Sequence, residues 1–391
     1  MKAGWEIKKV KDIASLITDG DWIESRHQSE DGIRLIQTGN VGNGVFKAKD
    51  DKPHYISEDT FNELGCTEIF AGDCLVSRLP EPVGRACIIP EISHRMITAV
   101  DCSIIRFKDV YLPKLFVYYT MSLSYQKDIN NNTTGTTRKR ISRKNLEQIS
   151  IPIPPLSEQE QIVSELDLIL GVIDKKKQQL KELDSLAQSI FYEMFGDPVE
   201  NEKGWEVKRI EEICEVYRGG SPRPIEKFLG GNIPWIKIGD ATQGDSIFLS
   251  KTKEHIIEEG LKKTRFIHSG SLIFANCGVS LGFARIITFD GCIHDGWLAF
   301  DNISSEIDKI FFLKSLNFCT SYFRRIAPDG IQPNLNTSIM KSFRQILPPF
   351  DMQISFVEKI QTIERLKQSL SKSLIEMETL FNSRMDYYFN S

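Results

Sequence analysis

The feature that most constrains this chain is an internal repeat. GWEIKKVKDIASLITDG, from Gly4 to Gly20, returns as GWEVKRIEEICEVYRGG, from Gly204 to Gly220. Further along, VGRACII from Val83 returns as LGFARII from Leu281, so the order of the segments is kept. A solenoid would need many short repeats, whereas here one long unit occurs twice. The 391 residues therefore predict a tandem duplication of a unit of about 195 residues.

Each copy ends in a proline step followed by a long helical pattern. Pro154-Pro155 and Pro348-Pro349 oppose helix propagation, and apolar residues then recur at spacings of three and four. The pattern predicts coiled-coil helices over residues 156–198 and 350–391, which we expect to pack on each other. The alternative is that each helix packs on its own domain. The predicted seam, interrupted by Lys176 and Lys367, contains Leu166, Ile169, Ile173, Leu180, Leu183, Ile190, Ile360, Ile363, Leu370, Leu374, Met377 and Phe381.

The two remaining parts, residues 1–155 and 199–349, look globular. Short β-like runs alternate with glycine turns and a few helical stretches, which favours mixed α/β domains with antiparallel or mixed strands. The fold class is therefore α+β. Helices are expected at 57–64, 112–128, 254–261 and 306–325, and Trp22, Trp235 and Trp297 are expected in the core.

If the two copies are equivalent, the chain should close on itself. Trp205 follows the first long helix by about ten residues. By the same spacing, Trp5 should lie near the end of the second long helix. The termini should then be close in a pseudo-two-fold, quasi-circular molecule.

Composition limits the functions that need to be considered. The chain has a net charge of −4, but residues 156–198 alone contribute −5, so the globular domains are close to neutral. No nucleotide-binding glycine loop, metalloprotease or hydrolase motif is present, and the eight cysteines and six histidines show no metal-ligand spacing. These absences favour a metal-free protein that is not an enzyme. The first ten residues include several charges and no apolar run reaches about 18 residues, which favours a soluble, cytoplasmic protein.

One basic segment, TGTTRKRISRK, stands out in the first domain. Arg138, Lys139, Arg140, Arg143 and Lys144 lie at a loop-to-helix junction, where cations, hydroxyls and backbone N–H groups can hold phosphates. A solvated helix face is the alternative.

The second domain has PDGIQPNLNTS at the corresponding place. Gln332, Asn334 and Asn336 offer amides suited to base edges, although they are also ordinary turn residues.

Other candidates are polar side chains that follow β-like runs near glycine. As DNA-contacting residues we consider Gln37, Asn40, Arg78 and Arg85 in the first domain, and Arg218, Ser221, Arg223, Lys237, Asp240 and Asn276 in the second; Asp21, Trp22 and His294 share this setting. Many such side chains are simply surface residues.

The whole chain resembles the specificity (S) subunits of type I restriction–modification systems. The resemblance rests on GWEIKKV and GWEVKRI, on IPIPPLSEQEQIV and LPPFDMQISFV, and on FYEMFGDP, RLPEPVGRACI, GTTRKRISRKNL and IPWIKIGDA. The second helix departs from the pattern because DMQISFV replaces SEQEQIV and no GDP follows it.

The resemblance implies two target-recognition domains joined by two long antiparallel helices in a chain that performs no chemistry. Each domain would read one half of a bipartite site in double-stranded DNA. The helices would set the spacing and dock two methyltransferase (M) subunits, and motor-nuclease (R) subunits would complete a restriction complex. S-adenosylmethionine, ATP and magnesium would bind the partners, with no cofactor and no metal on this chain. Unlike loops in the two copies imply an asymmetric site. The rival interpretation is a coiled-coil scaffold or adaptor without DNA binding.

The helices generate a testable prediction. About 39 helical residues span roughly 58 Å, which is more than one turn of DNA. Inserting four residues near Lys176 should change the tolerated spacer length while both half-sites are kept. Sequencing of the selected or methylated sites measures this, and loss of half-site preference would argue against a spacing role.

Overall fold

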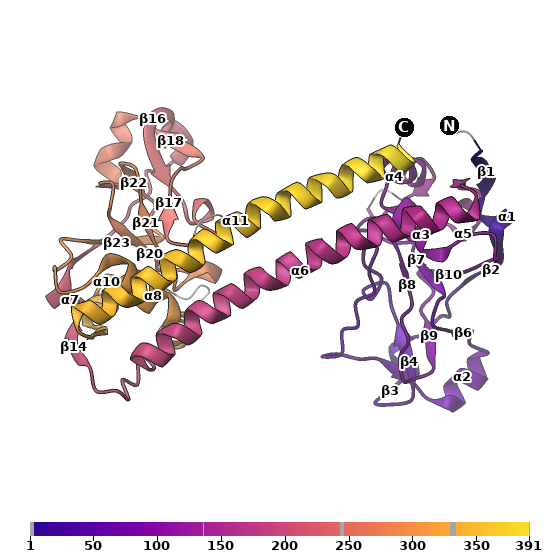
Figure 1. Ribbon diagram of the computed structural model, residues 1–391, viewed down its shortest axis with the longest axis horizontal. Coiled ribbons are helices and arrows are strands. Elements are labelled where there is room, and N and C mark those ends of the chain that lie inside the picture. Colours follow the sequence, from indigo (N-terminus) through magenta and orange to yellow (C-terminus); the bar gives the residue numbers. More distant parts are fainter. Residues whose placement is uncertain (1–3, 136, 243–245, 329–333, 391) are drawn as a thin grey trace. The chain divides into compact units, whose positions relative to one another are not determined.

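The computed structural model describes residues 4–135, 137–242, 246–328 and 334–390. The chain divides into two compact units, one of Met1–Lys175 with Leu374–Ser391 and the other of Lys176–Ser373. Two 40-residue helices, α6 (Leu156–Phe195) and α11 (Phe350–Phe389), each belong partly to both units (Figure 1). Each unit therefore contains one globular domain and a stretch of both helices.

The first globular domain is built on a four-stranded sheet, β2-β10-β7-β8, and a five-stranded sheet, β3-β5-β4-β9-β6. Two small pairs, β1-β13 and β11-β12, complete it. Its strands are β1 (Glu6–Lys9), β2 (Ala14–Asp19), β3 (Gln28–Ser29), β4 (Ile33–Ile36), β5 (Tyr55–Ile56), β6 (Glu68–Ile69), β7 (Cys74–Ser77), β8 (Ala86–Ile88), β9 (Met96–Thr98), β10 (Cys102–Phe107), β11 (Thr133–Thr134), β12 (Arg140–Ile141) and β13 (Ser150–Ile153). Its helices are α1 (Val10–Ile13), η1 (Ser25–His27), α2 (Glu58–Leu64), α3 (Pro113–Thr120), α4 (Leu123–Asn131) and α5 (Arg143–Glu147).

The second globular domain repeats this plan. Its sheets are β15-β23-β20-β21-β17 and β18-β16-β22-β19, with the pair β14-β24 in place of β1-β13. Its strands are β14 (Glu206–Arg209), β15 (Glu215–Arg218), β16 (Leu229–Ile236), β17 (Phe248–Leu249), β18 (Glu254–Ile256), β19 (Arg265–Ile267), β20 (Leu272–Ala275), β21 (Ala284–Ile287), β22 (Gly291–Ile293), β23 (Trp297–Asp301) and β24 (Arg344–Leu347). Its helices are α7 (Ile210–Ile213), η2 (Ile225–Lys227), η3 (Ile238–Asp240), η4 (Glu258–Lys263), η5 (Gly278–Ser280), α8 (Lys309–Phe318), α9 (Thr320–Ile326) and α10 (Thr337–Ser342).

The topology confirms the duplicated α+β fold with mixed sheets. Antiparallel pairs dominate, but β4 pairs with β9, and β16 with β22, in parallel. Most of the expected helices are present, as α2, α3 with α4, and α8 with α9. The helix expected at 254–261 is wrong. His255 and Ile256 belong to strand β18, which pairs with β16, and a 3-10 helix (η4) follows in place of an α-helix.

The helices pack on their domains and on each other. In the first unit, the cluster around Phe116 and Tyr125 includes Phe381, Met385 and Phe389 of α11 together with Leu166 of α6. Both described chain ends belong to this unit. Trp5 shares the cluster with Phe389, although its indole Nε1 donates to Glu158 of α6 (3.0 Å).

In the second unit, α6 and α11 pair antiparallel. Asp184 of α6 contacts Lys367 of α11 (2.6 Å), and Phe191 of α6 packs against Phe356 of α11, with ring centroids 5.4 Å apart. Residue numbers thus rise along α6 while those of the contacted residues fall along α11. The first unit has its own link, in which Glu165 accepts hydrogen bonds from Arg384 and from the Tyr388 hydroxyl (2.5 Å). All twelve predicted seam residues are buried or half-buried.

A buried glutamine at the start of each long helix holds it to its domain. Gln159 Oε1 accepts from the Leu112 N–H (2.8 Å), and its Nε2 donates to the Val110 and Pro154 carbonyls (3.0 and 2.9 Å). Gln353 repeats this pattern with the Asp308 N–H (2.8 Å) and with two carbonyls (3.0 and 2.9 Å), those of Glu306 and Pro348. Each amide thus ties the loop before α3 or α8 to the proline step.

Among the described residues, the second unit has a further tie between its domain and a long helix, a buried ion pair. Lys314 of α8 contacts Glu364 of α11 at 3.0 Å, and Ser246 Oγ donates to the same carboxylate (2.5 Å). Burial lowers the pKa of Lys314, while Lys314 helps to hold the pKa of Glu364 low against its desolvation. Tyr118, at the position in α3 that corresponds to Lys314, instead bonds Asp167 of α6.

These ties generate a stability prediction. Gln159→Leu leaves one buried N–H and two buried carbonyls without partners, so the free energy of unfolding should fall by about 2–4 kcal/mol. Gln353→Leu should behave in the same way. Chemical denaturation measures both variants. Gln161→Leu, on the exposed face of the same helix, is the control and should change stability by less than about 0.5 kcal/mol. Equal stability of all variants would contradict the proposed role of the ties.

Candidate nucleic-acid interface

Four chain segments meet beyond the ends of the main strands in each domain. We call the meeting of residues 19–22, 78–84, 99–101 and 140–143 junction 1. We call that of residues 218–223, 276–282, 294–296 and 334–337 junction 2. Four backbone hydrogen bonds of junction 1 have counterparts in junction 2. In junction 1 they run from Gly20 N to Cys102 O, Asp21 N to Thr98 O, Arg78 N to Asp101 O and Ile141 N to Arg78 O. In junction 2 the corresponding bonds, in the same order, run from Gly219 N to Trp297 O, Gly220 N to Ile293 O, Asn276 N to Gly296 O and Leu335 N to Asn276 O.

Glycine is required where the strands enter the junctions. A Cβ on Gly20 would overlap the Thr98 and Ala99 carbonyl oxygens, and one on Gly219 would overlap those of Ile293 and His294. Only glycine permits such a close backbone approach. The glycine that ends the first repeated segment therefore has a structural cause, and its structural counterpart is Gly219, one residue before the Gly220 that ends the second segment.

Charged side chains fill junction 1. Arg78 is buried, lies 3.3 Å from Asp19 and donates to the Val100 carbonyl. Arg140 lies 3.2 Å from Asp101, whose carbonyl accepts the backbone N–H of Arg78. Burial lowers the pKa of Arg78, but an arginine remains charged at neutral pH. The junction thus joins two arginines and two aspartates.

Two of the expected contact residues are used inside the first domain. Arg85 is buried and donates to the carbonyls of Val41 (2.6 Å), Leu79 (2.7 Å), Pro82 (3.1 Å) and Thr38 (2.8 Å). Asn40 is also buried; it accepts from the Gln37 N–H (2.9 Å) and donates to the Lys47 carbonyl (2.8 Å). These side chains shape the loops around junction 1.

The basic run lies on the surface beside junction 1. Arg138, Lys139 and Lys144 are exposed, and Arg143 contacts Glu147 one helical turn along α5 (3.3 Å). Ser142 caps α5 by accepting from the Asn145 N–H (3.1 Å). The cations are therefore presented to solvent from an ordered helix start.

Trp22 corrects a sequence expectation. It is 68% exposed rather than part of the core, whereas Trp235 and Trp297 are buried as expected. The neighbouring Asp21 forms a bridge with Ala99 inside junction 1, and Trp22 is the last residue of that junction segment. Its indole Nε1 donates to Glu24 (3.2 Å), so the exposed ring is held in place.

Asp295 is the centre of junction 2. Its carboxylate accepts from Ser221 Oγ (2.8 Å) and lies 3.6 Å from Arg223, and its carbonyl accepts from Arg218 Nε (3.2 Å). The sequence suggested these three partners but not Asp295. No local pattern marks this aspartate, because its partners lie more than seventy residues away.

Two further side chains of junction 2 are polar and shielded. Nδ1 of His294 accepts from the Gly296 N–H (2.9 Å), while Nε2 lies 3.0 Å from Asp295. Burial lowers the pKa of His294, so its imidazole is neutral at neutral pH. Asn276 Nδ2 contacts Asn334 Oδ1 (3.2 Å), and the buried Asn276 Oδ1 has no hydrogen-bond partner among the described residues.

The remaining candidates of the second domain also have partners. Asp240 accepts from the Lys237 N–H (2.8 Å), as Asn40 does from Gln37, and Lys237 pairs with Glu254. Asn336 caps α10 by accepting from the Ile339 N–H (2.9 Å). Gln332 lies outside the described residues.

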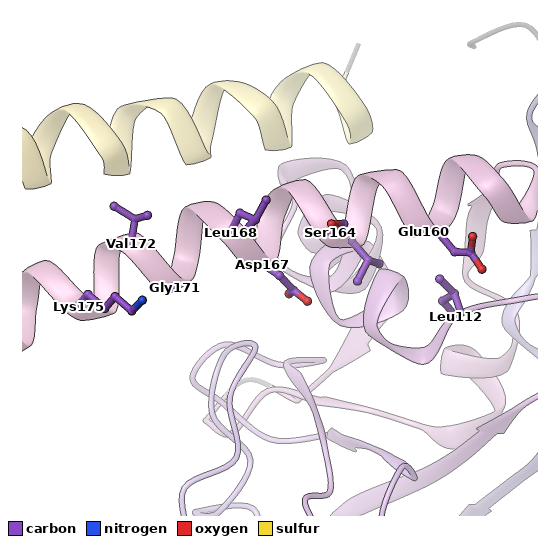
Figure 2. Close-up of a pocket in the computed structure, with 9 residues that line it drawn as sticks. Leu112, Glu160, Ser164, Asp167, Leu168, Gly171, Val172 and Lys175 are labelled. Carbon is purple, nitrogen blue, oxygen red and sulfur yellow. The ribbon is translucent and has the colours of Figure 1, made fainter.

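A shallow hollow lies elsewhere, on the outer face of α6 in the first unit. Figure 2 shows it lined by Leu112 and by α6 residues that include Asp167, Leu168 and Val172. Leu168 is 69% exposed. The lining combines apolar side chains with Glu160, Asp167 and Lys175, and it includes no residue of junction 1.

Two kinds of feature are absent from the described part of the chain. No group of three or more His, Cys, Asp or Glu side chains there is placed to hold a metal ion. Among the same residues, no helix is both long and apolar enough to cross a membrane.

The arginine that supports junction 1 generates a prediction. Arg85→Met removes the donor to four carbonyls, so the free energy of unfolding should fall by about 3 kcal/mol, and amide exchange in residues 79–84 should accelerate. Denaturant unfolding and hydrogen exchange measure this. Arg26→Met, at a largely exposed arginine, is the control. Unchanged exchange would show that Arg85 does not hold the loop.

The chain is similar to known proteins over both copies. The family "Type I restriction modification DNA specificity domain" matches residues 2–185 and 202–378. The MjaIX specificity subunit of Methanocaldococcus jannaschii is 28% identical over 72% of this chain and 68% of its own length. The EcoKI specificity subunit of Escherichia coli is 22% identical over 95% of this chain and 84% of its own length.

Solved structures share the fold. A chain from a structural study of assembly and conformational transition of a type I R-M system has a TM-score of 0.62 at 15% identity, covering 100% of this chain and 98% of that one. The S subunit from M. genitalium has a TM-score of 0.58 at 15% identity, with coverage of 100% and 98%. With two matched domains that span most of its length, the chain belongs to the type I restriction modification DNA specificity domain family.

Proposed function

We propose that this chain is the DNA sequence-specificity subunit of a type I restriction–modification complex. The observation that carries the proposal is the pair of corresponding junctions, each with its own set of polar side chains on one backbone plan. Each domain reads one half of a bipartite site, with junction 1 and junction 2 facing the two half-sites.

The unlike side chains of the two junctions favour an asymmetric target. Both junctions combine arginine with aspartate, but junction 2 adds to Arg218, Arg223 and Asp295 the amides and the neutral imidazole that junction 1 lacks among the described side chains. Different donors and acceptors select different base pairs in the major groove. A palindromic target would require the two sets to match.

The exposed basic run supplies contacts to phosphates. Arg138, Lys139 and Lys144 extend from the loop and helix beside junction 1, where they can fix the register of the domain on DNA without reading bases. Arg78 and Arg85 position the loops of junction 1 and do not contact DNA directly, because their guanidinium groups donate hydrogen bonds to carbonyls of the domain.

The chain acts without chemistry of its own. Two methyltransferase subunits dock on the helices and supply S-adenosylmethionine chemistry, and motor-nuclease subunits with ATP and magnesium complete the restriction complex. The outer face of α6 shown in Figure 2, with exposed Leu168 and Val172, is a suitable docking surface.

Copurification of a methyltransferase subunit in a 2:1 ratio would support this composition, whereas S-adenosylmethionine binding by this chain alone would contradict it.

Salt dependence tests the DNA contact. Replacing Arg138, Lys139 and Lys144 by alanine should weaken binding to all sequences and reduce the slope of log K against log salt by about 2–3 units, since each released phosphate contact contributes about 0.9. Titration of duplex DNA at several salt concentrations measures the slope.

The matched control is the triple alanine variant of Lys359, Arg365 and Lys372, exposed cations of α11. It should leave the slope unchanged. An unchanged slope in the first variant would contradict a phosphate role for the basic run.

A further inference from the structure

Within each junction, one loop projects a single side chain from a braced backbone. Residues 78–85 connect β7 to β8, and residues 276–283 connect β20 to β21. Both loops are closed by the same two hydrogen bonds, Ser77 N to Arg85 O with Gly84 N to Ser77 O, and Ala275 N to Phe283 O with Gly282 N to Ala275 O. Glu81 and Val279 therefore occupy the same position in the two copies.

Both loops are held from beneath by an arginine, although the arginines come from different elements. Arg85, the residue before β8, donates to the carbonyls on either side of Glu81, those of Leu79 and Pro82. Arg324 of α9 donates to the Val279 carbonyl (3.0 Å) and to the Leu281 carbonyl (3.2 Å). The backbones are thus fixed while the tip side chains point away from their own domain.

The tip side chains have little contact with the protein. Val279 is 96% exposed, and Glu81 is exposed between two prolines. A single exposed valine is common on protein surfaces. Here, however, the valine tops a braced loop that begins at Asn276 of junction 2, and its counterpart tops the loop that begins at Arg78 of junction 1.

We propose that Glu81 and Val279 are specificity-determining residues that each read one base pair. This rests on the proposed function and assigns a chemistry to each half-site. Val279 makes an apolar contact with the 5-methyl group of thymine, which only a T-containing pair presents in the major groove. Glu81 accepts a hydrogen bond from an exocyclic amino group, that of cytosine N4 in particular. The loop bracing keeps the entropy cost of these contacts low.

Reciprocal substitutions test the assignment. The chain, assembled with its methyltransferase partner, is used to select duplexes from a library with both half-sites randomised, and the selected DNA is sequenced. Val279→Glu should lower the preference for thymine at one base pair of one half-site by roughly tenfold, and Val279→Ala should lower it less. Glu81→Val should change one base pair of the other half-site. In each variant the second half-site should be selected as before.

Controls separate reading from general charge effects. Val110→Glu and Glu63→Val make the same exchanges at exposed positions away from the junctions and should leave both half-sites unchanged. Unaltered base preference in the Glu81 and Val279 variants, or a uniform loss of affinity for every sequence, would overturn the inference. Absence of any base preference in the wild-type complex would instead contradict the proposed function itself.

Discussion

The arrangement of each unit depends on one buried amide at the start of each long helix. Pro154-Pro155 and Pro348-Pro349 follow strands β13 and β24, and the carbonyls of Pro155 and Pro349 accept N–H groups of the first helical turn. The carbonyls of Pro154 and Pro348 need other donors. Gln159 and Gln353 satisfy one of these carbonyls and bind the loop before α3 or α8 with the rest of the amide. A side chain with both a donor and an acceptor is needed, because the loop presents an N–H and a carbonyl. The direction in which each helix leaves its domain is fixed by these bonds.

Farther along the helices, the two copies solve the same packing problem with different chemistry. In the first unit, Tyr118 of α3 bonds Asp167 of α6, whereas Lys314 of α8 pairs with Glu364 of α11 in the second. A buried ion pair contributes little net stability but is costly to break on one side. The second domain is therefore tied to its helix by a contact that tolerates little substitution, and the first by a hydrogen bond at the edge of an aromatic cluster.

The junctions separate structure from recognition. Their backbone hydrogen bonds correspond pair by pair, and glycine stands at the same crowded position in both. The side chains supported by this frame differ at nearly every corresponding place, as Arg78 and Asn276 or Glu81 and Val279 show. A frame held by backbone bonds can accept new side chains without loss of fold, which is a physical basis for domains that change target while keeping architecture.

The sequence by itself determined the duplication, the α+β class, the long helices and their apolar seam, because periodicity and repeated segments are local properties of a chain. It also indicated the loops that meet at the junctions, since glycine and polar residues mark strand ends. It did not determine which of those side chains form bonds within their own domain and which are exposed to solvent. Arg85 and Asn40 are bound within their domain, Trp22 is exposed rather than in the core, and residues 254–256 form a strand rather than a helix. Asp295, Gln159 and Gln353 gain their roles from partners far along the chain, and only the tertiary structure brings those partners together.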